Sequence, residues 1–272
     1  MQQTTFKENG IHYRNWPISG DARALVLIVH GLGEHCGRYD TFAGALNAAG
    51  YAVASLDLPG HGQSDGRRGH IDRFSQYCDA VLALYEKISK AYPDLPVFLL
   101  GHSMGGLIST QLLLKHQGKF AGALLSGPAI QSPQQPPAFQ VAVIKMIAAL
   151  FPKLGVLVLD ASGISRDPVV VEDYMQDPLV NKGKLSARLL VEMFKAMEEC
   201  KANADKITLP IRIMHGGRDD MTSPEGSELL YKRVGSKDKE LRIYNGLMHE
   251  ILNEPEGLEI TQEIIAWMDG HQ

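Results

Sequence analysis

The sequence predicts an α/β protein in which a mostly parallel central sheet carries helices on both faces. Short apolar runs rich in β-branched residues alternate with longer amphipathic runs, which is the pattern of successive strand–helix–strand units. The alternation stops between about residues 128 and 205, where the sequence is helical and apolar, and then resumes. A composition with 44% hydrophobic and 21% charged residues is typical of a folded domain.

The expected strands are short and apolar, and the expected helices lie between them. Residues 3–6 and 11–16 flank an Asn-Gly pair, which favours a tight hairpin turn, so an antiparallel edge is expected there. Buried strands are expected at 24–29, 51–56, 97–100, 121–125, 211–215 and 241–244. Helices are expected near 39–49, 74–91, 106–116, 224–234 and 258–268. In the second of these, apolar residues recur three or four positions apart, the spacing of one helix face.

The interrupting block begins with the proline-rich stretch SPQQPP, which is typical of a stiff connector. Apolar residues then recur at helical spacing in 139–150 and again in 185–197. An insertion between parallel strands emerges at the end of the sheet where open α/β folds bind ligands. We therefore expect residues 128–205 to form a helical cap over a site, inserted after the sixth strand. The core is then expected to comprise residues 1–127 and 206–272.

Charge and cysteine content exclude several classes of protein. The net charge is −4 with acids and bases interspersed, which argues against a nucleic-acid partner. Three distant cysteines, Cys36, Cys78 and Cys200, form no zinc motif and no disulfide framework, and so favour a reducing compartment. The polar start MQQTTFKENG has no signal-peptide core, and no apolar run approaches the roughly 20 residues of a membrane span. A cytoplasmic protein, free or peripheral at a membrane surface, is expected.

The strongest local motif is Gly101-His102-Ser103-Met104-Gly105, which follows an apolar strand and leads into a helix. This is G-x-S-x-G in its required strand–turn–helix context. A tight turn there exposes the serine hydroxyl at a helix N-terminus, where free N–H groups favour negative charge. Ser103 is the predicted nucleophile, and a glycine-rich turn without chemistry is the alternative.

A nucleophilic serine needs a base, and the base needs an acid that orients it. In this kind of sheet the order along the chain is serine, acid, histidine, each at the end of a strand. Asp219 follows the expected strand 211–215, and His249 follows the expected strand 241–244. Both lie beyond Ser103, so the order is satisfied.

The choice of acid has an alternative, because Asp220 adjoins Asp219 and spacing barely separates them. Asp219 is preferred, and its neighbour is expected to form a salt bridge or to cap the following helix. Pairing of His249 with Glu250 or Glu225 is a more remote alternative.

Ester hydrolysis by a serine also needs N–H donors for the oxyanion of the tetrahedral intermediate. One donor is expected from the backbone of Met104, directly after the nucleophile, and the other from Leu32 in the loop after an early strand. That loop lacks the Gly-Lys-Ser/Thr end of a phosphate-binding loop. Its His30, Glu34 and His35 have no second cluster at metal-ligand spacing, so neither a metal nor a cofactor is expected.

Together these segments resemble the α/β-hydrolase fold and, within it, the monoacylglycerol lipase and lysophospholipase group. The matching stretches are HGLGEHCGRY at 30–39, Asp57 with GHGQS at 60–64, GHSMGG at 101–106, Tyr174 with DPL at 177–179, Gly216 with Asp219, and His249. They occur in family order from residue 30 to residue 249. The first of them is much more selective for this group than the nucleophile motif.

The resemblance implies a cap that forms an apolar channel for an acyl chain and whose rim touches a membrane. It also implies that Glu34, Arg38 and Tyr174 bind the glycerol end of the substrate. Mammalian monoacylglycerol lipase has a second histidine after the catalytic one, where this chain has Leu252, so head-group preference stays open. Residues 138–150 are mainly apolar with one lysine, Lys145, which suits either a lipid-docking helix or a packed cap helix.

The predicted function is hydrolysis of monoacylglycerols or similar single-chain lipid esters. Ser103 attacks the ester, His249 oriented by Asp219 moves the proton, and the amides of Leu32 and Met104 hold the oxyanion. A lysophospholipase, or a general carboxylesterase or thioesterase, would use the same groups on other substrates. A catalytically silent lipid-binding protein of the same fold is the alternative from a different class. Epoxide hydrolases and dehalogenases are disfavoured because they use an aspartate nucleophile.

Overall fold

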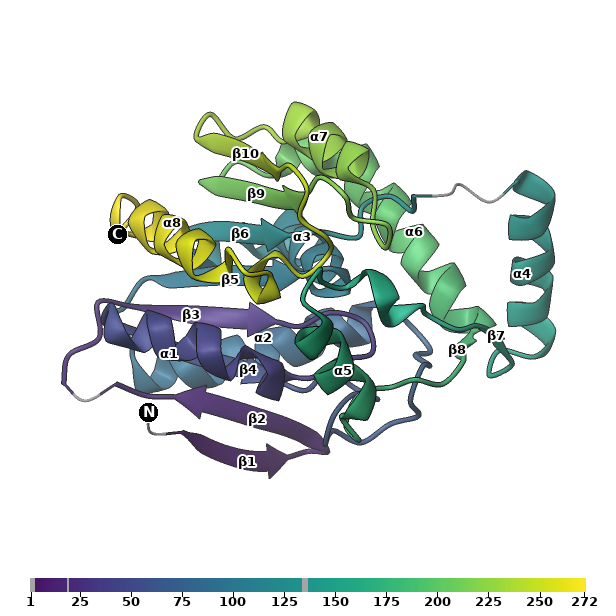
Figure 1. Ribbon diagram of the computed structural model, residues 1–272, viewed down its shortest axis with the longest axis horizontal. Coiled ribbons are helices and arrows are strands. Elements are labelled where there is room, and N and C mark those ends of the chain that lie inside the picture. The colour runs from purple at the N-terminus through teal and green to yellow at the C-terminus, as the bar shows by residue number, and fades with distance from the viewer. Residues whose placement is uncertain (1–2, 19, 134–136) are drawn as a thin grey trace.

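The computed structural model describes residues 3–18, 20–133 and 137–272 and contains an eight-stranded sheet (Figure 1). The strand order is β1-β2-β4-β3-β5-β6-β9-β10. In chain order the strands are β1 (Thr4–Glu8), β2 (Ile11–Trp16), β3 (Ala24–Val29), β4 (Tyr51–Leu56), β5 (Val97–His102), β6 (Gly122–Ser126), β9 (Ile211–Gly216) and β10 (Lys239–Tyr244). From β4 to β10 in this order, neighbouring strands are parallel. The predicted mostly parallel sheet is therefore confirmed.

The hairpin of β1 and β2 forms the antiparallel edge that the Asn-Gly pair predicts. Asn9 and Gly10 have φ angles of 51° and 78°, as a type I′ turn requires at its two central positions. Asparagine and glycine tolerate these angles better than other residues, so the turn fixes where the chain reverses. The first strand begins one residue later than predicted and continues to Glu8.

Helices cover both faces of the sheet. Two of them, α1 (Asp40–Ala48) and α8 (Gly257–Asp269), pack on one face. The other face carries α2 (Ser75–Ala91), α3 (Met104–His116) and α7 (Pro224–Arg233). Alternate residues of β3 face the two layers, so the whole strand is buried and reads as continuous apolar sequence.

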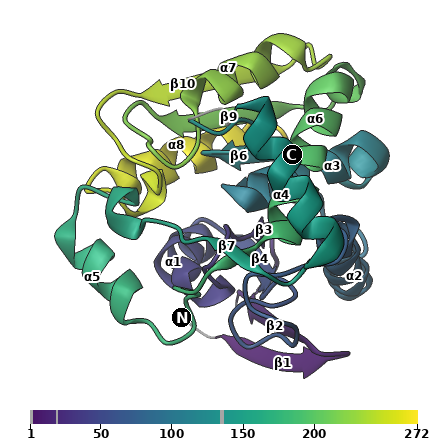
Figure 2. The same ribbon diagram turned by 90° about the vertical axis from the view of Figure 1, so that its right-hand side faces the viewer.

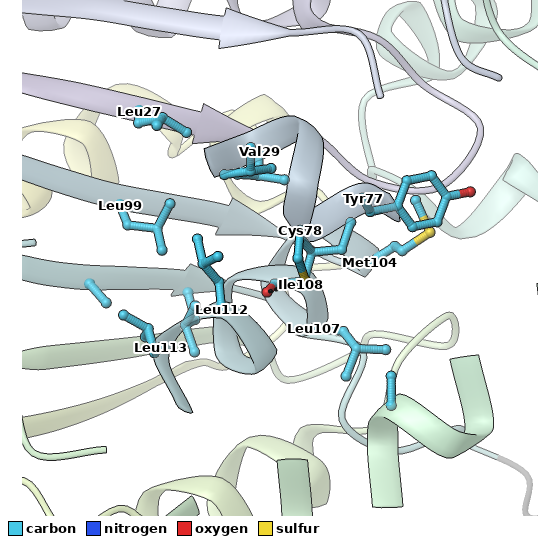
Figure 3. Close-up of a cluster of buried hydrophobic side chains, with 14 of the residues drawn as sticks. Leu27, Val29, Tyr77, Cys78, Leu99, Met104, Leu107, Ile108, Leu112 and Leu113 are labelled. Carbon is cyan, nitrogen blue, oxygen red and sulfur yellow. Dashed lines mark hydrogen bonds between the residues drawn. The ribbon is translucent and has the colours of Figure 1, made fainter. Parts of the chain in front are cut away.

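The core between α3 and the sheet is close-packed next to the turn that carries Ser103. Figure 3 shows Val29 of β3 and Leu99 of β5 near Ile108 and Leu112 of α3, all of them buried. The start of α3 reaches the sheet because Gly105 has no side chain: a Cβ there would overlap the backbone oxygen of Val29. The second glycine of the motif is thus a packing requirement.

Replacing Gly105 with alanine is expected to lower the free energy of unfolding by about 3 kcal/mol, the upper end of overpacking costs. The added carbon meets backbone atoms of β3, which cannot move without displacing the strand. Urea unfolding followed by circular dichroism measures the change. Gly118→Ala is the matched control, because a Cβ at Gly118 meets no atom within 4 Å. Equal stability of the two variants would contradict this account of the motif.

Between β6 and β9 the chain leaves the sheet and forms a segment that we call the insertion. It contains α4 (Ala138–Leu150), β7 (Gly155–Leu157), α5 (Pro168–Gln176), β8 (Leu185–Ser186) and α6 (Ala187–Asn203). Figures 1 and 2 show these elements at the carboxyl ends of the parallel strands, with α4 farthest out. Helix α6 packs against α3 and contributes Leu189, Met193 and Cys200 to the main core.

Helix α5 is an element that the hydrophobic pattern does not predict. Its first half is rich in β-branched valines, which favour strands, but Asp167 caps it by accepting a hydrogen bond from the N–H of Val169 (2.9 Å). Pro168 occupies the first turn, where its missing N–H costs nothing. The Asp-Pro pair was the available signal for this helix.

Five short 3₁₀ helices complete the described secondary structure. They are Cys36–Tyr39, Gln117–Lys119, Ala161–Gly163, Ala204–Lys206 and Ile251–Asn253. The first and the last lie in the loops that lead away from the site described next. No helix within the ranges that the structure describes is long and apolar enough to cross a membrane.

Candidate active site

Ser103 lies at the turn between β5 and α3 in a backbone conformation that is unusual for a serine. Its φ and ψ angles are 54° and −119°. The turn is held from β6 and the loop after it: the Ser103 N–H donates to Ser126 O (2.9 Å), and the Ser103 carbonyl accepts from the N–H of Ala129 (3.0 Å). Such strained positions persist where the surroundings fix them, and they cluster at functional sites.

His249 and Asp219 meet at the carboxyl ends of β10 and β9. His249 Nδ1 lies 2.6 Å from Asp219 Oδ2, and both side chains are buried. The other carboxylate oxygen accepts the N–H groups of Met221 (2.8 Å) and Thr222 (2.9 Å). Asp220 is exposed. The structure thus brings Asp219, and not its neighbour, to the histidine.

The charges of this pair stabilise each other. Burial by itself raises the pKa of Asp219, but the contacts with His249 and His215 outweigh it and hold the pKa far below its usual range. Burial lowers the pKa of His249, and the charge and hydrogen bond of Asp219 more than reverse this, so the net pKa is raised. The pair is therefore arranged to stabilise an imidazolium next to a carboxylate.

Ser103 and His249 line one cavity of about 160 Å³, and Leu32, Met104, Glu34 and Tyr174 line it too. Half of its other lining residues are large apolar side chains from the insertion. These are Leu157, Leu159, Ile164, Leu185, Leu190, Met193, Phe194 and Met197. The insertion therefore lies over the serine and histidine and gives their cavity an apolar lining.

The predicted oxyanion donors both line this cavity: Leu32 lies in the loop after β3, and Met104 is the first residue of α3. In the described part of the chain, the N–H groups of Leu32 and Met104 donate to no protein acceptor. The loop before Leu32 is fixed by Glu34, whose Oε1 accepts from the N–H of Gly31 (2.6 Å) and from the hydroxyl of Tyr39 (2.9 Å). Two free N–H groups at one cavity are what an oxyanion site needs.

Glu34, Arg38 and Tyr174, which the family resemblance assigns to the glycerol end, lie together in a buried ion network. Arg38 donates to Glu34 (2.9 Å) and, with both terminal nitrogens, to Glu250 (2.6 and 2.8 Å). Its guanidinium lies 4.7 Å from the centre of the Tyr174 ring. The network links the loop of Leu32 to the loop of His249, and its contact with substrate stays a prediction.

The ionised form of Glu34 is expected to contribute to stability at neutral pH. Burial raises the pKa of this carboxyl, but Arg38 and nearby histidines lower it to about 2 overall. A glutamate in the unfolded chain has a pKa of about 4.3. The contribution of ionised Glu34 to the free energy of unfolding is therefore complete above that pH and is lost as the pH falls towards 2.

We therefore expect the stability difference between the wild type and Glu34→Gln to shrink from about pH 5 to about pH 3. Urea unfolding at a series of pH values measures it. Glu259→Gln, at an exposed position of α8, is the control and should follow the wild type throughout. A difference that stays constant with pH would show that the Glu34 charge contributes nothing.

Among the described residues, one buried group could in principle hold a metal ion: His12, Cys36 and Asp57. Both Asp57 oxygens already accept backbone N–H groups, from Cys36 (2.9 Å) and from Gln63 (2.8 Å). Burial also raises the pKa of the Cys36 thiol well above its ordinary value, which disfavours the thiolate that a metal binds. The cluster therefore connects neighbouring loops, and the Cys36 side chain is almost completely buried.

The fold and the site define a class. A mostly parallel sheet, a serine on a strained strand-to-helix turn and an Asp-His pair beyond later strands are the features of the α/β-hydrolases. The family described as serine aminopeptidase, S33, matches residues 20–256, and the chain belongs to this family. The predicted α/β-hydrolase fold and family are thereby confirmed.

Similar proteins include several lipases. A monoacylglycerol lipase of Mycolicibacterium smegmatis is 37% identical over 261 residues, which cover 96% of this chain and 93% of the relative. The monoglyceride lipase of Homo sapiens is 34% identical over 258 residues, which cover 94% of this chain and 85% of the relative. The crystal structure of Paleococcus ferrophilus monoacylglycerol lipase matches with a TM-score of 0.87 and 34% identity, covering 96% of this chain and 99% of that one. The chain is a carboxylic ester hydrolase.

Two features of the site escape sequence reasoning. His215 contacts Asp219 from the end of β9, and Glu250 is the partner of Arg38. A histidine in the expected strand 211–215, just before the loop that carries Asp219, was the available signal for the first. The second joins residues 212 positions apart, which no local spacing reveals.

Proposed function

We propose that this enzyme hydrolyses monoacylglycerols to glycerol and a free fatty acid through an acyl-enzyme intermediate on Ser103. The observation that carries the proposal is the largely apolar cavity whose lining includes Ser103 and His249. An acyl chain fits apolar walls, and its ester carbon then lies at the serine. The similarity to monoacylglycerol lipases over nearly the whole chain supports this substrate class.

In the first half of the reaction, His249 Nε2 takes the proton of the Ser103 hydroxyl as its oxygen attacks the ester carbonyl. Asp219 holds the imidazole by its Nδ1–H and stabilises the imidazolium that forms. The tetrahedral oxyanion accepts hydrogen bonds from the N–H groups of Leu32 and Met104. When the intermediate collapses, the bond to the glycerol oxygen breaks, and His249 gives that oxygen its proton.

The second half repeats these steps with water. His249 takes a proton from a water molecule that attacks the acyl carbonyl, and the same two amides stabilise the new oxyanion. Collapse then breaks the bond to Ser103, and the serine oxygen regains its proton from His249. The fatty acid is released, and the resting enzyme needs no cofactor.

The charges beside the cavity favour a neutral head group over a phosphorylated one. Glu34 and Glu250 contribute two carboxylates, and Arg38 contributes one guanidinium, all of them buried or nearly so. An additional phosphate placed there would meet a net negative charge in a medium that screens little. This supports monoacylglycerol over lysophospholipid as the substrate.

Fatty-acid release from monoacylglycerol, lysophosphatidylcholine, triacylglycerol and a short-chain ester tests the proposal, with Ser103→Ala as the blank. We expect monoacylglycerol to give the highest kcat/KM. A preference for the lysophospholipid or for the short ester would move the function to the lysophospholipase or carboxylesterase alternative. Failure of the wild type to react with a fluorophosphonate probe would instead favour a silent lipid-binding protein.

We also propose that residues 128–205 act as a cap that docks on membranes through α4. Its outward side chains Phe139, Met146, Leu150 and Phe151 are each more than half exposed. Figures 1 and 2 show that α4 stands at the outer end of the insertion. An exposed apolar helix face next to a cavity for an acyl chain suits contact with the bilayer that holds the substrate.

The double substitution Phe139→Ser and Phe151→Ser is expected to weaken binding to phosphatidylcholine vesicles at least about tenfold. The reason is that burying one phenylalanine side chain contributes about 2 kcal/mol to the free energy of binding. Co-sedimentation with the vesicles measures this, and hydrolysis of a short, water-soluble ester should be unchanged. Leu258→Ser is the matched control, because it changes an exposed leucine on α8, a helix that lies away from α4 in Figure 1. Equal vesicle binding by all three proteins would contradict docking through α4.

A further inference from the structure

Asp219 contacts a second histidine besides His249. His215, the fifth residue of β9, places its Nε2 3.0 Å from Asp219 Oδ2, the oxygen that His249 Nδ1 also approaches. Thr222 Oγ1 donates to the same oxygen (2.9 Å). One carboxylate oxygen therefore lies between two imidazole rings, and both rings are almost completely excluded from solvent.

The partners of His215 assign its tautomer. Nε2 faces two acceptors, Asp219 Oδ2 and the carbonyl oxygen of Thr222 (3.2 Å), so it carries a hydrogen. Nδ1 lies 2.7 Å from the hydroxyl of Ser227 on α7, which can donate to it. A continuous line of contacts thus runs from His249 through Asp219 and His215 to Ser227.

We infer that His215 is a positioning residue of the proposed triad, whose N–H shares Asp219 with His249 and sets how strongly the carboxylate acts on the catalytic ring. The inference deepens the proposed function and rests on it. A carboxylate that accepts a second N–H hydrogen bond has less charge to offer the first. The contact with His215 also holds the Asp219 carboxylate in place while His249 moves between the serine and the leaving group.

Other charged groups face His249, but none of them depends on His215. Glu250 adjoins it in its own loop, Glu34 approaches from the loop after β3, and both raise its pKa. His102 at the end of β5 lies 4.7 Å away between ring centres, and burial together with His249 lowers its pKa to about 4. His215 reaches His249 through Asp219 and through Thr222, whose Oγ1 lies 3.3 Å from His215 Nε2 and 3.4 Å from His249 Nδ1. Of these two groups only Asp219 is charged, so a shift in the titration of His249 tests the connection through the carboxylate.

Two variants of similar length separate the N–H from the bulk of the ring. His215→Gln places an amide N–H near the position of Nε2, and His215→Met fills the space without a donor. In the methionine variant Asp219 acts on His249 alone and favours its charged form more strongly. Since catalysis needs neutral His249, the acid limb of the kcat/KM profile should move up by about half a pH unit, with kcat about tenfold lower.

His215→Gln should keep the wild-type acid limb and recover most of kcat. Ser227→Ala, which removes only the outer contact, should shift the limb less than His215→Met does. A purely structural role would lower the rate of both His215 variants without moving the limb. An acid limb of His215→Met at the wild-type pH, or a glutamine variant no better than the methionine one, would overturn the inference.

The titration of His249 followed by NMR gives a readout that does not depend on turnover. It is measured in the Ser103→Ala background, with and without His215→Met. The methionine should raise the midpoint of the His249 titration by about the same half pH unit. If Ser103→Ala itself still hydrolysed esters, the proposed function would fail while this NMR result could still stand. An unmoved midpoint would defeat the role of His215 and leave the function untouched.

Discussion

Ser103→Ala is expected to lower kcat for ester hydrolysis by about 10⁴-fold or more, because loss of the nucleophile disables the whole triad. The residue sits in a turn held by backbone hydrogen bonds to Ser126 and Ala129, which the substitution leaves in place. Folding should therefore be unaffected. Release of fatty acid by freshly purified protein measures the first effect, and thermal unfolding the second. Activity well above background would refute the assignment of Ser103.

Ser103→Gly provides a second test at the same residue. At an ordinary position a glycine is less stable than an alanine by about 1 kcal/mol, because it gains more freedom in the unfolded chain. At φ 54° and ψ −119° alanine is strained and glycine is not, so the two inactive variants should be equally stable or the glycine variant more so. A Ser103→Gly variant that is clearly less stable than Ser103→Ala would show that the turn carries no strain.

Asp219→Asn is expected to reduce kcat by about 10⁴-fold, the size of effect that an amide in place of a triad carboxylate produces. The amide can present an N–H to His249 Nδ1, which would then lose its hydrogen and leave Nε2 unable to accept a proton from Ser103. Its fold should survive, because the N–H groups of Met221 and Thr222 can still bond to the remaining carbonyl oxygen.

Asp220→Asn is the matched control for this substitution. Asp220 is exposed, so its charge faces water instead of His249. We expect kcat and KM within twofold of the wild type, about the scatter of neutral surface substitutions. Steady-state kinetics on the same monoacylglycerol measure both variants. Similar losses in both would mean that the orienting acid is not Asp219 alone.

The order of strands and helices could be predicted because it depends on local pattern. Strands such as β3 are buried on both faces and therefore read as unbroken apolar runs, and the hairpin is encoded by Asn9 and Gly10. The placement of Ser103, Asp219 and His249 follows from the same fact, since loops after parallel strands meet at one edge of the sheet. Here local sequence fixes the topology, and the topology brings distant residues together.

What could not be predicted depends on contacts between distant segments. The pairing of Arg38 with Glu250 needs the loops after β3 and β10 to be side by side, and only the folded chain shows that they are. Asp219 could be preferred over Asp220 only weakly, because the turn after β9 decides which side chain points inward. Helix α5 lies in the block predicted to be helical but was not predicted as an individual element, because its valines favour strands and the helix depends on the cap at Asp167.

The origins of the cavity walls have a consequence for how such enzymes diverge. Ser103, Asp219 and His249 are attached to strand ends, whereas most apolar wall residues, Leu190 and Phe194 among them, belong to the insertion. Under the proposed function, mutations in the insertion can reshape the space for the acyl chain while the sheet keeps the proposed reacting groups in register. Natural selection, or a laboratory library confined to those walls, can therefore change chain-length preference in small steps and retain a working enzyme at each one.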